Sequence, residues 1–476
     1  MVPISLLMAL CSTAAPGTNG LPQADQPLDL PAAVELALSR NLDLARTAQS
    51  VRGQRIGVAA AKADFAPRLR PDTYATVTDA NSSWQYGVAA ARKLRWGTDV
   101  ELGVRAGGVD DDETDGTRKA ALRVGLHQPL FRNFGSLVNL EGVADATSAL
   151  KAARRSYEQQ KADLIVQVAE SFETVIRLER QINFDRQAVA RMERVLRLTR
   201  AREKQGRSTR VDTLRVELQK GQAEGRLASS REALSSAQSD FAELLGFRPE
   251  IDFKLVPPPL LELEAPAVEV ATAIAFSNRM DYAQALQDYE DSGRNVRIAR
   301  RRRYPDIVLT GLFERQGEGE RFSDASKLDE NAWTVGLTVG SEFSPLADRV
   351  ALDRAETDRV GVGQNIRILE LAIARQVQQQ LIAYRRAQND RVIAERNARL
   401  AASRARLARR LFDIGRGDSF AVTDAEDALI QADIEDRSAR SNASISAYRL
   451  LRTLGTLVEH PADLRPPPLE EGSLTP

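Results

Sequence analysis

Apolar residues recur at alternating steps of three and four along residues 136–245, a stretch that contains no proline. Such spacing is typical of a coiled-coil helix that buries a narrow stripe against a partner. A break at residues 204–209, where Gly206 can end one helix and a Ser/Thr pair can cap the next, predicts two antiparallel helices. The stripe is formed by Leu164, Val168, Ser171, Val175, Leu178, Ile182, Val189, Met192 and Leu196.

The same arrangement recurs nearer the C-terminus, where residues 346–459 again lack proline and a glycine-containing break lies at residues 413–418. The preceding segment recurs as well, because residues 33–67 match residues 271–305 at a constant shift of 238. Matches in register over such a length indicate an internal duplication. The matched positions include Ala33 and Ala271, Ala37 and Ala275, Asp43 and Asp281, and Pro67 and Pro305.

The pattern changes from a helical period to a period of two after Pro67 and after Pro305. One face of each run is apolar and the other is polar or tiny, as in strands of a transmembrane barrel with lipid outside and water inside. The alternative is an antiparallel sheet in a soluble domain. The candidate strands are residues 72–79, 119–127, 306–314 and 332–341, with further alternating runs at residues 84–94 and 98–105.

These patterns divide the chain into segments. We expect a first repeat over residues 21–246, with a helix, strands at about 68–127 and a long helix pair at 136–245. A proline-rich linker at 247–266 leads to a second repeat over 267–457, with a helix, strands at about 305–341 and a helix pair at 346–455. Residues 458–476 form a C-terminal tail.

Residues 1–20 are expected to be a signal peptide, because residues 2–15 are apolar and end in small side chains. The basic start of such a peptide is missing, so a chance apolar N-terminus is the alternative. Cys11 is also a candidate lipid acceptor, although Leu10 is larger than the small residue usual before such a cysteine. No later stretch approaches the ~20 apolar residues of a membrane-spanning helix.

The composition argues against a globular enzyme. Hydrophobic residues make up 43% of the chain but aromatic residues only 5%, which suits long alanine-rich helices better than an enzyme core. Lysine plus arginine and aspartate plus glutamate both number 66, so no basic footprint for nucleic acid is present. With one cysteine, two histidines and no phosphate-binding or dinucleotide-binding motif, we expect no metal site, no cofactor and no enzymatic activity.

The ordered motifs resemble the outer membrane efflux protein family, the TolC-like outer-membrane channels. The signature pieces are the segment Leu28-Asp29-Leu30 with residues 41–44, the corner at residues 128–135, and the helix-pair ends at 243–246 and 452–455. The resemblance covers about residues 28–457. It implies a mainly α protein with transmembrane β strands, in which long antiparallel coiled-coil helices and β-hairpins form a trimeric α-barrel and a shared outer-membrane β-barrel.

The resemblance also implies four strands per protomer. The extra alternating runs at residues 84–105 depart from that pattern. We expect them to form an elaborated outer loop, the alternative being a larger barrel.

The candidate site residues follow from the resemblance, in which the two helical turns dock a periplasmic adaptor and close the pore. Gating candidates are Asp424, Asp212, Phe412 and Arg416, and docking-turn candidates are Gly206, Arg207, Gly415 and Gly417. Lumen-facing candidates are Lys119, Arg123 and His127, the alternative being that these three side chains only satisfy loops. By the resemblance, Asp424 occupies the position of a carboxylate in the ring that narrows the pore, and Asp212 that of the partner carboxylate on the first helix pair. Phe412 and Gly417 occupy the positions of the residues that link to this partner carboxylate in the family. Those links are therefore lost, and Arg416 is the candidate substitute. As an alternative, both aspartates are surface residues near helix starts, favoured by the helix dipole.

The function implied is that of a homotrimeric, passive exit duct through periplasm and outer membrane, in a tripartite efflux or type I secretion system. A periplasmic adaptor and an inner-membrane pump of the RND or ABC type would open it, and outer-membrane lipid would surround it. The exported cargo (drugs, metal ions or polypeptides) is left open. The alternative is a periplasmic coiled-coil adaptor or scaffold without a barrel.

Overall fold

The computed structural model describes residues 27–78, 81–111, 114–206, 209–251, 253–340, 345–414 and 419–467. The expected signal peptide at residues 1–20 and Cys11 lie outside this part of the chain. The described residues divide into two compact units, the first within residues 27–45, 161–267 and 378–453, and the second within residues 46–160, 268–377 and 454–467.

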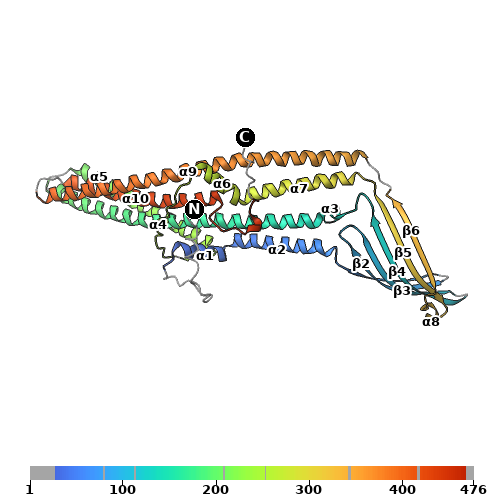
Figure 1. Cartoon of the computed structure of the whole chain (residues 1–476). Helices are drawn as coiled ribbons and strands as arrows, with labels where there is room; N and C mark the ends of the chain where they lie inside the picture. Colours follow the sequence, from blue (N-terminus) through green and yellow to red (C-terminus); the bar gives the residue numbers. More distant parts are fainter. Residues whose placement is uncertain are drawn as a thin grey trace. The chain divides into compact units, whose positions relative to one another are not determined.

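Helices and strands alternate along the chain in two rounds (Figure 1). The helices are α1 (Leu30–Arg40), α2 (Leu42–Ala63), α3 (Ser136–Asn139), α4 (Glu141–Lys204), α5 (Arg210–Leu244), α6 (Val268–Asn278), α7 (Met280–Arg302), α8 (Phe322–Ala325), α9 (Pro345–Asp413) and α10 (Ser419–Leu454). The strands are β1 (Arg68–Val77), β2 (Asn81–Lys93), β3 (Asp99–Asp111), β4 (Thr114–Pro129), β5 (Ile307–Gly319) and β6 (Glu330–Val339), and a short 3-10 turn covers Ala462–Leu464. The mainly α fold class with an antiparallel sheet is therefore confirmed.

In the first unit, the apolar stripe of α4 packs on α5. Val168, Phe172 and Val175 are almost fully buried, and the rings of Phe172 and Phe241 meet edge to face at 5.9 Å between centroids. The stripe is interrupted by Asp185, which is only 6% exposed. Its carboxylate accepts a 2.6 Å hydrogen bond from Ser230 on α5, so this polar side chain is satisfied within the helix pair.

In the second unit, the strands form one antiparallel sheet in the order β1-β2-β3-β4-β5-β6. The expectation that residues 84–105 form an outer loop is wrong, because these residues lie in β2 and β3, which pair with each other and with β1 and β4. A tight turn joins β2 to β3, with Leu94 N–H donating to Thr98 O at 2.7 Å and Gly97 at a φ of +92°. Because the alternation of residues 84–105 has the same period as in the other strands, the pattern was the signal for pairing.

Each unit also contains a close approach between a glycine after a long helix and the end of a short N-terminal helix. Gly246 follows α5 with φ +77°, and Gly455 follows α10 with φ +71°. A Cβ on Gly246 would lie 2.5 Å from Arg40 O, and a Cβ on Gly455 would lie 3.0 Å from Asn278 O. Arg40 and Asn278 are equivalent under the shift of 238 residues, so the two repeats share this contact.

In the first unit, α5 ends in a Schellman cap, and the side chain of a neighbouring asparagine is hydrogen-bonded to this helix end. Gly246 N–H donates to Glu243 O at 2.9 Å and Phe247 N–H donates to Ala242 O at 2.8 Å. The amide of Asn41 donates to Leu244 O at 2.9 Å, and its side-chain oxygen accepts from Leu44 N–H at 3.0 Å. Asn41 therefore caps α2 and holds the end of α5 at the same time.

None of the helices in the described ranges has a window long and apolar enough to span a membrane.

We expect Gly246→Ala to destabilise the protein by at least ~2 kcal/mol, because alanine is strained at positive φ and its Cβ would clash with the backbone of Arg40. The measurement is the free energy of unfolding. Gly221→Ala is the matched control, because Gly221 lies exposed inside α5 with open space around its Cβ, and alanine should stabilise it by ~0.5–1 kcal/mol. Equal stability of Gly246→Ala and the wild type would contradict this account.

Candidate functional site

The sheet has one apolar face, and that face is exposed. Residues that alternate along every strand point to it, and the register pairs them across the sheet, as with Leu102 and Val124. Exposed patches of this size on a single chain mark a surface that is covered by another molecule or by lipid. The exposed side chains include Leu69, Val77, Tyr86, Val88, Leu102, Val104, Val124, Leu126, Phe313, Trp333, Val335, Leu337 and Val339.

The opposite face of the sheet is polar and carries ion pairs that cross from strand to strand. Arg70 on β1 meets Glu101 on β3 at 2.8 Å, and Arg105 on β3 meets Glu314 on β5 at 3.3 Å. Each pair reaches over the strand between its members, where the residues level with Arg70 and Arg105 are Ala89 and Ala121. Alanine and glycine on this face therefore leave room for long charged side chains.

The three lumen-facing candidates lie on this polar face, inside β4 and not in loops. Lys119 pairs with Glu318 of β5 at 3.3 Å, and Nδ1 of His127 lies 3.4 Å from the hydroxyl of Thr310. Arg123 stands level with Gly103 and Glu314. The structure thus brings the three residues onto one face, but acidic neighbours accompany the cations.

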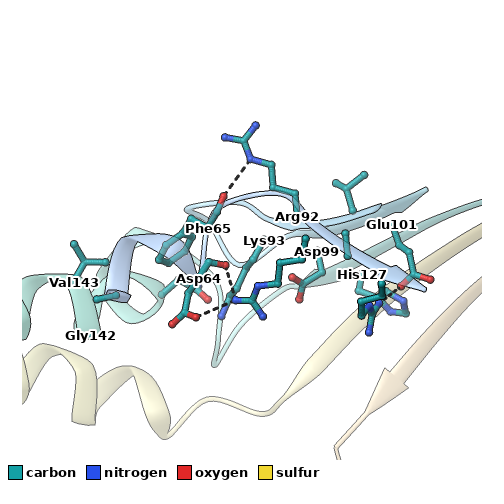
Figure 2. Close-up of a pocket in the computed structure, with 15 residues that line it drawn as sticks. Asp64, Phe65, Arg92, Lys93, Asp99, Glu101, His127, Gly142 and Val143 are labelled. Atoms are coloured by element: carbon teal, nitrogen blue, oxygen red, sulfur yellow. Dashed lines mark hydrogen bonds and ion pairs between the residues drawn. The ribbon is translucent and has the colours of Figure 1, made fainter. Parts of the chain in front are cut away.

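A groove of about 680 Å³ lies on the same polar face, where α2 ends and the strands begin (Figure 2). Asp64, Lys93, Asp99 and His127 are among its lining residues, and Arg92 donates to the carbonyl oxygen of Phe65 at 3.3 Å. Its charges are largely satisfied within the chain, since Arg68 pairs with Asp64 at 3.0 Å and Arg70 with Glu101. The groove is a water-facing surface with no converging group that selects one ligand.

Of the expected docking-turn residues, Gly206 is described. It has φ +71°, with open space around its Cβ. Its N–H donates to Glu203 O at 2.9 Å and ends α4. Arg207, Gly415, Arg416 and Gly417 lie outside the described residues, and so does the side chain of Phe412.

Asp212 is part of a capping box at the start of α5. Its backbone N–H donates to the Thr209 hydroxyl at 3.2 Å, and its carboxylate accepts from Thr209 N–H at 3.0 Å and from the Thr209 hydroxyl at 2.7 Å. The guanidinium of Arg215 lies 3.9 Å away. The carboxylate therefore stabilises a helix start, as the alternative interpretation of this residue expects.

Asp424 has a partner that the sequence analysis missed. Its carboxylate forms a short ion pair with Arg404 of α9, and both side chains are more than half exposed. Further along α9, Arg409 pairs with Glu426 of α10 at 2.8 Å. Arg404 lies nine residues before the end of α9 and Asp424 five residues after the start of α10, so equal distance from the turn does not identify this partner in the sequence.

The first unit holds a further charged cluster beside the proline-rich linker. Burial raises the pKa of the Glu173 carboxyl, against the opposing effects of a 2.8 Å hydrogen bond from Ser441 and the charge of Arg180. Burial also lowers the pKa of Arg180, and the charge of Arg437 acts in the same direction. These groups line a groove of about 410 Å³ that includes Pro257.

Within the residues that are described, no cluster of three or more histidine, cysteine, aspartate or glutamate side chains has metal-binding geometry.

A sheet with an exposed apolar face and an ion-paired polar face, joined to long antiparallel helix pairs, defines the class of outer-membrane channel proteins. The model of the outer membrane efflux protein family matches residues 33–247 and 273–456. The chain therefore belongs to this family, which assigns it to the outer membrane and to efflux. No curated protein sequence matches the chain significantly.

Solved channels have the same fold. The chain is 18% identical to the outer-membrane channel OprN, with 90% of this chain and 89% of that chain covered at a TM-score of 0.65. It is 14% identical to the Campylobacter jejuni CmeC outer membrane channel, with 91% of this chain and 87% of that chain covered at a TM-score of 0.67. It is 17% identical to the open state of the Neisseria gonorrhoeae MtrE outer membrane channel, with 90% of this chain and 89% of that chain covered at a TM-score of 0.65.

The raised pKa of Glu173 generates a pH-dependent stability prediction. A carboxyl whose pKa is higher in the folded than in the unfolded state contributes stability at low pH, and this contribution is lost as the pH rises through the folded pKa. We therefore expect Glu173→Gln to melt at a higher temperature than the wild type at pH 7, with a difference that disappears toward about pH 4. Glu232→Gln, at an exposed position on α5, is the control. A lower melting temperature of Glu173→Gln at pH 7 would contradict the prediction.

Proposed function

We propose that three copies of this chain form a passive exit duct through the periplasm and outer membrane. The observation that carries the proposal is the two-faced sheet, because an apolar face suits lipid while an ion-paired face suits a water-filled interior. The strands are long enough for this role, since β1 and β6 have 10 residues each and a tilted membrane strand needs ~9–11.

The helices supply a second argument for assembly. An apolar row runs along α9 to Ile414, the residue after its end, in three steps of eleven residues followed by three steps of seven. Both periods keep a row on one side of a supercoiled helix. The members are between 57% and 75% exposed in the single chain, so the row needs a partner helix from another copy. They are Val360, Leu371, Ile382, Ile393, Leu400, Leu407 and Ile414.

In this proposal the energy for export comes from an inner-membrane pump, and a periplasmic adaptor couples that pump to the duct. The adaptor binds the two helical turns, which contain Gly206, Arg207, Gly415 and Gly417. Positive φ and open space around Gly206 support this role, because they leave the end of α4 accessible. The pump class and the cargo follow from the partners and not from this chain.

Closure of the duct is assigned to Asp424, with Arg404 as the residue that holds its carboxylate. A threefold ring of carboxylates narrows an opening and favours cations. The ion pair with Arg404 supports an anchored position for each carboxylate. Asp212 contributes less directly, by fixing the start of α5 through its capping box with Thr209.

The membrane assignment is tested by one substitution on each face of β6. Val335→Arg puts a charge on the apolar face near the middle of the strand, which should cost ~2–4 kcal/mol in lipid. We expect the variant to be lost from the salt-washed outer-membrane fraction, whereas the wild type remains there as a heat-labile trimer. Thr334→Arg, on the polar face, is the matched control and should insert normally. Recovery of the wild-type chain as a soluble periplasmic protein would contradict the proposal.

The closure assignment is tested by single-channel conductance in planar bilayers. Asp424→Asn removes one charge of the Arg404 pair, and we expect the closed-state conductance to rise several-fold and the cation preference to fall. Because the pair is exposed, thermal stability should change by less than ~1 kcal/mol. Glu395→Gln is the control, since Glu395 pairs with Arg399 within α9 itself at 3.0 Å. Identical conductance in Asp424→Asn and the control would show that Asp424 does not close the duct.

A further inference from the structure

The sheet ends in two open edges, β1 and β6. Among the described residues, neither strand has a second neighbour, so the N–H and C=O groups along its outer side lack a strand partner within the chain. Water satisfies such groups on a soluble protein. In hydrocarbon they have to pair with another strand, because each unpaired group costs several kcal/mol.

The exposure of the apolar face rises toward these edges. On the apolar face, large apolar side chains of β1 and β6 are 61–81% exposed, whereas those of the four inner strands are at most 61% exposed, and Trp84, Val100, Leu122 and Leu309 are only partly exposed. A side chain on an inner strand is covered by neighbours on both sides, and an edge side chain by only one. The apolar face is therefore least covered along the two edge strands. The edge residues are Leu69, Val77, Trp333, Val335, Leu337 and Val339.

The two edges fit each other. β1 and β6 have the same length of 10 residues, and because every neighbouring pair is antiparallel they run in opposite directions. Both place apolar residues on one face and polar or small residues on the other. β6 of one copy can thus pair with β1 of a second copy in an antiparallel ladder that keeps the apolar faces of both strands on the same side of the sheet.

The sheet also has the stagger that a closed sheet requires. Following the paired residues from strand to strand, Arg68 at the start of β1 is level with Thr334 in the middle of β6, and not with Val339 at its end. Strands that are displaced in this way tilt against the axis of the closed sheet.

The inserted hairpin of β2 and β3 is held as part of the sheet at its turn. Gly135 N–H donates to Trp96 O at 2.9 Å, which ties the turn to the corner between β4 and α3. Gly97 fits tightly there, since a Cβ would lie 2.8 Å from Asn133 O. Both strands therefore add to the width of the sheet.

We propose that the copies join β6 of one chain to β1 of the next, and that three copies close a single antiparallel sheet of 18 strands, six from each chain. This inference rests on the threefold assembly of the proposed function and sets its width. With strands ~4.8 Å apart and tilted by about 36–40°, 18 strands give a diameter of about 35 Å, against about 23 Å for 12 strands. The hairpin β2–β3 thereby roughly doubles the cross-section that four strands per chain would enclose.

The direct test is an electron cryomicroscopy image of the full-length protein in lipid nanodiscs. We expect three copies and a sheet of about 35 Å diameter. A variant lacking residues 81–111 is the matched comparison, because β1 ends and β4 begins at the same end of the sheet, so β1 can pair directly with β4. That variant should give about 23 Å.

A crosslink tests the pairing of β2 with the edge strand β1 independently of the image and of the deletion variant. In a Cys11→Ser background, Thr73→Cys with Tyr86→Cys should form a disulfide within one chain, because these residues are paired between β1 and β2. Thr73→Cys with Leu102→Cys, two strands apart, is the control and should not crosslink.

The outcomes separate the two proposals. Three copies around a sheet of about 23 Å, or no crosslink between β1 and β2, would overturn the 18-strand sheet and leave the exit duct standing. A number of copies other than three would overturn the assembly on which both rest.

Discussion

Backbone hydrogen bonding at the edges of the sheet is the constraint on which this structure depends. Within one chain, six antiparallel strands satisfy each other, but the outer sides of β1 and β6 have no strand beside them in the part of the chain that is described. The apolar face adds a second demand, because it is exposed on every strand. Lipid covers an apolar face but does not satisfy an open edge. Pairing of β1 with β6 of another copy provides the backbone hydrogen bonds that the single chain does not supply at these edges.

The long helices have a related need. The buried stripe of α4 packs on α5 in the first unit, whereas the row along α9 stays exposed. A narrow apolar row on a helix of 69 residues is stable only against a lateral partner. Sheet and helices therefore both require contacts with further copies of the same chain. The close approach of Gly246 to Arg40 recurs between Gly455 and Asn278, so the end of one long helix is held in the same way in each unit.

The sequence predicts those features that follow from periodicity. Steps of three and four specify the helix pair, and alternation specifies the strands, including the runs at residues 84–105 whose pairing the family pattern of four strands led us to reject. Contacts between distant segments were not predictable in the same way. The pairing of Asp424 with Arg404 depends on the register of α9 against α10, which the period within each helix does not fix. The cap of α5 at Thr209 is local, and the Ser/Thr pair before this helix predicts it. Alternation predicted that residues 119, 123 and 127 share the polar face, but their neighbours on β5, which are Glu318, Glu314 and Thr310, required the sheet order.

Hydrogen–deuterium exchange of the protein in lipid tests the central constraint most directly. If copies complete the sheet, the backbone amides of β1 and β6 are protected as strongly as those of β3 and β4, apart from Pro71, which has no amide hydrogen. Fast exchange along β1 and β6 beside a protected β3–β4 pair would mean that the edges stay open, and the account of the chain as one part of a closed assembly would be wrong.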